Sequence, residues 1–231
     1  MFYATNDIGF LAGIVAALVT NSDLPLANED KIIGFLGGMD IPGINDFLVG
    51  YIEGAKTVDP DIQVLVSYAG DFTDPAKGKE LSLIQYNAGA DISYNVAGGT
   101  GLGLLDAAKD LDTYAIGVDS DQAMLFADSD PLKAEHIVTS TVKMIDLALL
   151  RAVKLDIEGN LEYGIYDMLG IKEGGVGLAK NSYYESILSD DIKNTIDEIE
   201  QQFINGELTV SSAFGMSSEE INVLRNSVSV K

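Results

Sequence analysis

Glycines and acidic residues follow the apolar segments of this chain, at points where a parallel sheet would bind a ligand. Gly98-Gly99 ends the apolar run 90–97, and Asp119 ends the run 113–118. In parallel sheets, ligands bind outside the carboxyl ends of the strands. Backbone N–H groups there can donate to ligand oxygens, and a carboxylate can accept from two vicinal hydroxyls. The sequence therefore predicts a small-ligand site around Gly99 and Asp119.

The glycine run 98–103 also raises the alternative of a dinucleotide-binding turn, because Asp119 lies about twenty residues further on. The spacing does not fit that pattern. Counted from Gly99, the third glycine comes one residue early, and counted from Gly101, Asp106 occupies the last glycine position. We therefore expect no nicotinamide or flavin cofactor. An NAD(P)-dependent oxidoreductase is the weaker alternative.

Three other side chains are candidates for ligand contact. Lys143 is expected in the first turn of a helix, where its charge opposes the helix dipole at a cost of about 0.3–1 kcal/mol. A lysine placed there should meet an acceptor or a ligand. Phe72 stands in a turn, where it could pack against the following helix or stack on a flat ligand. Tyr94, on an apolar strand, is by default a core residue.

Residues for catalysis or metal binding are scarce. The chain has no cysteine and one histidine, His136, which is expected to be structural or at the surface. Thiolate chemistry, disulfides and sites with several histidines are thereby excluded. Asp121 is expected to cap a turn, and Asp128 and Asp130 lack EF-hand spacing. These patterns favour a binding protein over an enzyme, with no bound metal.

The charge of the chain excludes one class of partner. Fourteen basic and thirty-six acidic residues give a formal net charge of −22. Such a surface repels phosphate backbones, so no nucleic-acid partner is expected. The apolar stretch 9–19 is too short to span a bilayer and lacks basic flanks, and no secretory signal is visible.

The elements that must position these residues alternate between strands and helices. The expected strands cover 31–36, 61–68, 90–97, 113–118 and 136–141, and turns with glycine or aspartate follow the first four. One helix is expected at 43–58, a second begins at the cap Asp74-Pro75, and a third follows the glycines at 98–101 and runs to about Lys109. A fourth helix follows residue 141, with Val142, Ile145, Leu149 and Val153 inward, and a fifth covers 189–205. A surface tail follows the last helix. This alternation predicts an α/β fold with a parallel sheet and right-handed crossovers.

The turns, read in order, resemble those of the basic membrane protein (BMP) family. Members are substrate-binding lipoproteins of ABC importers and include purine nucleoside receptors. The segments that carry the resemblance are 9–13, 34–42, 74–81, 97–103, 115–122, 139–143 and 170–178. They cover nearly the whole chain in the order of the family. The resemblance implies a type I periplasmic-binding-protein-like fold, in which two Rossmann-like lobes with parallel sheets close on a nucleoside.

The resemblance also assigns roles to residues of this sequence. It implies stacking on the base by Phe72 and Tyr94, a backbone contact from Gly99, and contacts to the sugar hydroxyls from Asp119 and Lys143. A further contact is implied for Asp7, which stands where the family usually has glutamate. Tyr94 stands where phenylalanine is usual. The implied partner is an ABC transporter permease, and the implied location is outside the cytoplasm, at the cell membrane.

The front of the family pattern is missing from this sequence. Members normally begin with a signal peptide, a lipidated cysteine and the first βα units of lobe one. We therefore assign 1–30 to a remnant of lobe one, 31–135 to lobe two, 136–165 to a segment returning to lobe one, and 166–231 to the return to lobe two and the C-terminal helices. An incomplete first lobe exposes sheet edge and apolar surface, which favours self-association or pairing with another polypeptide. An intracellular ligand-sensing regulator of the same fold is the alternative function.

Overall fold

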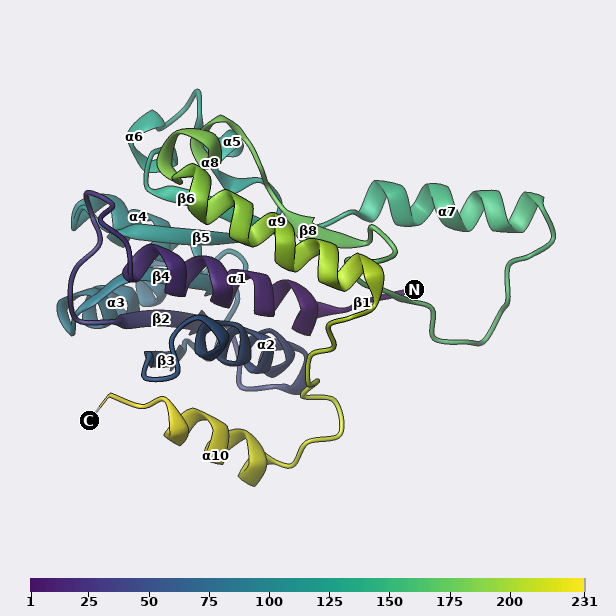
Figure 1. Ribbon diagram of the computed structural model, residues 1–231, viewed down its shortest axis with the longest axis horizontal. Coiled ribbons are helices and arrows are strands. Elements are labelled where there is room, and N and C mark those ends of the chain that lie inside the picture. The colour runs from purple at the N-terminus through teal and green to yellow at the C-terminus, as the bar shows by residue number, and fades with distance from the viewer. Residues whose placement is uncertain (231) are drawn as a thin grey trace.

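The computed structural model describes residues 1–230, which form a six-stranded sheet and a separate two-stranded sheet (Figure 1). In spatial order, the larger sheet contains β3 (Gln63–Tyr68), β2 (Ile32–Gly37), β4 (Ala90–Val96), β5 (Tyr114–Asp119), β6 (Ile137–Lys143) and β8 (Val176–Leu178). The first five strands run parallel, and β8 pairs antiparallel with β6. The predicted α/β fold with a parallel sheet is confirmed, and the five predicted strands match within two residues.

Helices cover both faces of this sheet, as Figure 1 shows. The helices among residues 1–230 are α1 (Thr5–Thr20), α2 (Pro42–Val58), α3 (Pro75–Asn87), α4 (Leu102–Asp110), α5 (Gln122–Phe126), α6 (Pro131–Ala134), α7 (Ile145–Ile157), α8 (Ser182–Ile187), α9 (Asp190–Asn205) and α10 (Ser218–Ser227). One apolar core joins α1, α2 and α9 to one face, and a second joins α3 and α4 to the other. Strands buried on both faces read as continuous apolar runs, which is why they were visible in the sequence.

Helix α1 is buried on nearly all sides by the sheet, α2 and α9, and its backbone touches that of α2. A Cβ on Gly9 would lie 2.3 Å from the Phe47 carbonyl oxygen, and one on Gly13 would lie 2.1 Å from that of Tyr51. Gly50 and Gly54 make the reciprocal contacts from α2. Residues 1–30 were assigned to lobe one, yet α1 shares the core of the six-stranded sheet. The lobe boundaries themselves stay a prediction.

A smaller unit lies beside the main sheet. It consists of β1 (Phe2–Tyr3) paired with β7 (Met168–Leu169), and of α7, which extends away from the body in Figure 1. The prediction that α7 packs inward was wrong, because Ile145, Leu149 and Val153 are 55%, 63% and 55% exposed. Val142 belongs to β6 instead. Within residues 1–230, the only buried residue of α7 is Ala148.

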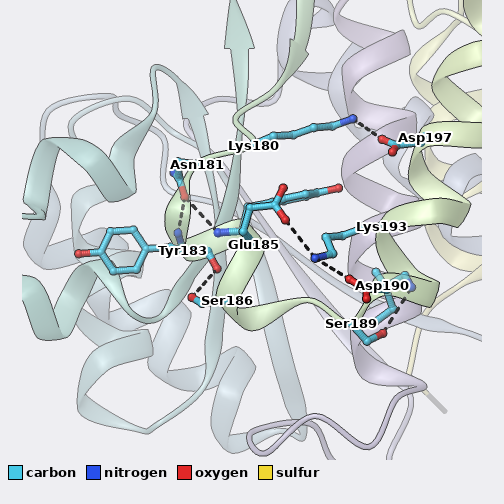
Figure 2. Close-up of polar contacts among 11 residues, drawn as sticks. Lys180, Asn181, Tyr183, Glu185, Ser186, Ser189, Asp190, Lys193 and Asp197 are labelled. Carbon is cyan, nitrogen blue, oxygen red and sulfur yellow. Dashed lines mark hydrogen bonds and ion pairs between the residues drawn. The ribbon is translucent and has the colours of Figure 1, made fainter.

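The connection from β8 to α9 is fixed by caps and ion pairs (Figure 2). The Asn181 side chain accepts from the first N–H groups of α8, and the Ser189 hydroxyl accepts from the start of α9. Lys193 bridges Glu185 at 3.0 Å and Asp190 at 2.9 Å. Helix α9 ends at Gly206, whose φ of +73° is a left-handed C-cap. No helix that the structure describes is long and apolar enough to cross a membrane.

Candidate ligand-binding site

The carboxyl ends of the parallel strands bring most of the predicted site residues to one edge of the sheet. We call Gly38, Phe72, Gly98-Gly99, Asp119 and Lys143 the strand-end site. Its loops are tied to each other by backbone hydrogen bonds. Gly38 N donates to Val96 O at 3.0 Å, and Gly70 N donates to Gly38 O at 2.7 Å. The loops after β2, β3 and β4 therefore form one continuous surface.

The Phe72 ring packs against the backbone of Gly38 and Gly98. A Cβ on Gly38 would lie 2.2 Å from the Phe72 ring, and one on Gly98 would lie 3.7 Å from it. The Phe72 carbonyl accepts from Thr100 N at 3.0 Å. The ring is half-buried. A flat aromatic side chain held in this way at a strand end can stack on a flat ligand.

The glycine turn before α4 offers fewer free donors than expected. The backbone N–H groups of Thr100, Gly101, Leu102 and Gly103 already donate to carbonyl oxygens within the turn or nearby. The expectation of bare N–H groups at this helix start was therefore wrong for these four residues. A pyrophosphate would need those donors, so the geometry also disfavours the dinucleotide alternative. Gly99 itself is exposed at the sheet edge.

Asp119 and Lys143 form an ion pair across neighbouring strands. The Lys143 Nζ lies 2.8 Å from Asp119 Oδ1, and the side chains are 24% and 54% exposed. The prediction that Lys143 lies in a helix was wrong. It is the last residue of β6, because the strand continues to pair there with Val176 of β8. Asp119 has a φ of +67°, a left-handed conformation that aspartate tolerates better than most residues.

The ammonium of Lys143 also lies near the aromatic ring of Phe47 on α2. Its Nζ is 5.2 Å from the centre of the Phe47 ring. At that distance the ring face attracts a cation. The contact joins α2 to β6 and could not be read from the sequence, where the two residues are far apart.

Tyr94 lies in the core beneath the strand ends. Its side chain is fully buried, and its hydroxyl bonds Thr141 Oγ1 at 2.7 Å. The rings of Phe35, Phe47 and Tyr51 surround it. Burial holds the pKa of the Tyr94 phenol well above its usual range. The structure thus places Tyr94 with the aromatic core and apart from the exposed residues of the strand-end site.

Asp7 lies in the first turn of α1, beside a different cavity. That cavity of about 470 Å³ is lined among others by Asp7, Asp46 and Glu173, and not by Phe72, Asp119 or Lys143. Burial raises the pKa of the Asp7 carboxyl to about 6, against a hydrogen bond from the Ile171 backbone, and the charge of Glu173 raises it further. A carboxyl with this pKa is partly protonated near neutral pH and can both donate and accept.

The remaining polar candidates have structural roles. Asp121 caps α5, as predicted, and also accepts from Asn181 Nδ2 at 2.7 Å. Asp130 caps α6 and pairs with Lys109 at 2.7 Å. The Nδ1 atom of His136 lies 2.9 Å from the Thr113 carbonyl oxygen. Within residues 1–230, no cluster of three or more acidic or histidine side chains could hold a metal ion.

The fold is that of the type I periplasmic solute-binding proteins. A solute-binding protein of an ABC transporter system from Aeropyrum pernix K1 superposes with a TM-score of 0.77 and 25% identity, over 99% of this chain and 72% of that one. A transcriptional activator of the comK gene from Bacillus halodurans gives a TM-score of 0.74 and 25% identity, over 90% of this chain and 65% of that one.

The family follows from the sequence match. The model of the Bmp family, ABC transporter substrate-binding protein PnrA-like, matches residues 1–213, and the chain belongs to this family. The ABC transporter nucleoside-binding protein BmpA of Lactococcus lactis subsp. cremoris is 32% identical over 220 residues. The match covers 91% of this chain but 59% of that protein. The chain therefore spans little more than half the length of this relative.

Proposed function

We propose that the strand-end site binds a purine nucleoside, and the ion pair between Asp119 and Lys143 carries the proposal. The vicinal hydroxyls of a ribose can donate to the Asp119 carboxylate and accept from the Lys143 ammonium. Charge-assisted hydrogen bonds of this kind are about twice as strong as neutral ones. Asp119 is more than half exposed, so a ligand can reach it. The name of the Lactococcus lactis relative, a nucleoside-binding protein, supports the same ligand class.

The base of the nucleoside would stack on Phe72, and the Gly99 backbone would contact it from the neighbouring loop. Stacking of one base on an aromatic side chain contributes about 1–3 kcal/mol. The stacking role implied for Tyr94 stays a prediction and requires its buried ring to become exposed. Asp7, on α1, is proposed as a further contact that a closed ligand site would bring to the nucleoside. These groups bind and orient, and we propose binding without catalysis.

Calorimetric titration of the full chain with inosine, adenosine, guanosine and ribose tests this function. We expect binding of the nucleosides, and binding about tenfold weaker or more in D119N and K143Q, because each variant removes a charged hydrogen-bond partner. K109Q is the control, since it breaks the Lys109–Asp130 ion pair, which joins α4 to the cap of α6 and lies outside the strand-end site. No heat with any nucleoside would contradict the proposal.

We propose further that the ligand lies between two lobes, of which the chain contains one and part of another. The partial lobe would consist of β1, β7 and α7, with 136–165 as the segment that enters it. Polypeptide equivalent to the part of the Lactococcus lactis relative that the chain does not match would complete the partial lobe. Both edges of the β1–β7 pair are unpaired within the described residues, and such edges accept a further strand. Self-association through the same surface is the other outcome that the tests below distinguish.

Membership of the Bmp family supports a role of the protein in transport of the bound ligand. We propose that the protein acts outside the cytoplasm at the cell membrane and delivers its ligand to an ABC transporter permease. The likeness to a comK transcriptional activator favours ligand sensing inside the cell as the second candidate. An intact lipidation signal encoded in frame upstream of Met1 would reject the sensing role, and its absence from the gene would reject the anchored transport role.

A further inference from the structure

Arg225, on the C-terminal helix α10, reaches back to the loops of the strand-end site. Its Nη1 donates to Asp40 Oδ2 at 2.9 Å, and its Nη2 donates to Asp40 Oδ1 at 2.7 Å. Nη2 also lies 2.8 Å from the Tyr68 hydroxyl and 3.0 Å from Asn45 Oδ1. The guanidinium is 4.7 Å from the centre of the Tyr68 ring. One side chain from the end of the chain thus contacts the loop after β2, the start of α2 and the end of β3.

These contacts fix the two segments that carry the aromatic face of the site. Asp40 follows Gly37 and Gly38, and Tyr68, the last residue of β3, precedes Phe72, which lies on the connection from β3 to α3. A Cβ on Gly37 would lie 2.7 Å from the Tyr68 ring, just as one on Gly38 would meet Phe72. The two glycines therefore lie in direct contact with the two rings. A shift of Tyr68 or of Asp40 would therefore act on the glycine backbone that Phe72 contacts.

We propose that Arg225 is a positioning residue for the proposed nucleoside site and that it holds Phe72 against the Gly38 backbone through Asp40 and Tyr68. This inference rests on the proposed function. Arg225 acts through other residues and is not itself expected to touch the ligand. A bidentate arginine–carboxylate pair sets direction as well as distance, which suits this role. Its guanidinium is well shielded, because the side chain is 18% exposed.

Helix α10 has attachments that do not depend on Arg225. Val64 N donates to Val228 O at 2.7 Å, and Val228 is 3% exposed within the main core. Upstream of the helix, Asp46 accepts from Ser212 Oγ at 2.6 Å and from Ala213 N at 2.9 Å. The expectation that the tail lies on the surface was therefore wrong at Val228. Substitution of Arg225 should leave α10 attached, so its effect on Phe72 can be measured in the folded protein.

The absence of tryptophan from the sequence gives a direct readout. A single tryptophan introduced by F72W would report the order and exposure of this side chain without any ligand. In the F72W background, we expect R225Q to increase acrylamide quenching and to lower the fluorescence anisotropy of the tryptophan. D40N should act in the same direction. R225K keeps the charge but not the bidentate geometry. Its quenching and anisotropy should therefore lie between those of R225Q and those of the F72W parent.

The control is K193Q, which breaks the ion pairs of Lys193 with Glu185 and with Asp190 shown in Figure 2. The side chains of Lys193 and Glu185 are 18% and 58% exposed, which resembles the 18% and 52% of Arg225 and Asp40. K193Q should change the melting temperature by an amount similar to R225Q but leave the fluorescence of the tryptophan unchanged. Equal fluorescence in R225Q, K193Q and the parent would overturn the positioning role and leave Arg225 as an attachment of α10.

Nucleoside titration of R225Q without the F72W change gives the second readout. We expect binding weaker by between about twofold and thirtyfold, the range of couplings that pass through intermediate residues. Unchanged nucleoside affinity in R225Q would overturn the inference even if the proposed function holds. A fluorescence response in R225Q with no nucleoside binding in the parent protein would contradict the proposed function and keep the mechanical link between Arg225 and Phe72.

Discussion

At the scale of single residues, the sequence indicated the site through residue types that are costly where they stand. Phe72 in a turn and Asp119 after a buried strand both lie at the strand ends. Lys143 was selected for a wrong reason, an opposing helix dipole, although it does meet an acceptor in Asp119. The contacts of Phe47 and Arg225 could not be predicted, because they join distant parts of the chain. No local pattern distinguishes these residues from an ordinary core phenylalanine and a surface arginine.

Two buried carboxyls should make the stability of the protein depend on pH. Burial raises the pKa of Asp7 and of Asp91 from 3.8 to about 6. Asp91 accepts from Thr20 Oγ1 at 2.9 Å and Asn28 N at 2.8 Å through one oxygen, and its other oxygen has no partner among the described residues. A raised pKa favours the protonated folded state. The stabilising contribution is therefore complete below 3.8 and is lost as the pH rises through about 6.

We expect the free energy of unfolding to increase as the pH falls from 7 to 5, measured by urea denaturation at each pH. D91N should reduce this slope, because the amide does not titrate, and D7N should reduce it independently. D121N, which removes the carboxylate that caps α5, is the control for the loss of one negative charge. A slope that is unchanged in both the D7N and D91N variants would contradict the assignment.

At the scale of elements, the sheet was predictable and helix α1 was not. The central strands are apolar runs ended by glycine or aspartate, and α3 begins at the capped Asp74-Pro75 pair. In α1, the apolar residues lie on all sides, so the periodicity that marks a surface helix is absent. Strand β8 has three residues, too few to show an alternation. The orientation of α7 was mispredicted because an apolar helix normally packs inward.

The contact of α1 with α2 predicts a steep cost for one added methyl group. In G13A, the new Cβ would lie 2.1 Å from Tyr51 O and 2.8 Å from Ala55 N, both backbone atoms that cannot move alone. We expect a loss of about 1–3 kcal/mol in the free energy of unfolding. G43A is the matched control, because nothing lies within 4 Å of its Cβ. Urea denaturation should show G43A neutral or slightly stabilised, and equal losses in the two variants would disprove the close contact.

At the scale of the whole molecule, the exposed apolar surface of α7 predicts association. Leu149, Leu150 and Ile157 are 63%, 51% and 79% exposed on this one helix. Light scattering at increasing concentration should show a rising mass, and L149E should suppress it with little change in stability, because exposed positions contribute within about 0.5 kcal/mol. L125E, at a 66% exposed leucine on α5, is the control. A monomeric mass throughout would contradict self-association.

The four glycines between α1 and α2 also have a consequence for how the native protein opens. Two helices whose backbones touch cannot separate by rearranging side chains, so neither can expose its amides while the other stays in place. Their amide protons should exchange with solvent through one shared opening of high free energy. Those of α7, which packs on little, should exchange much faster. Native-state hydrogen exchange should therefore divide the chain into a slow unit built on α1 and α2 and a fast unit around α7.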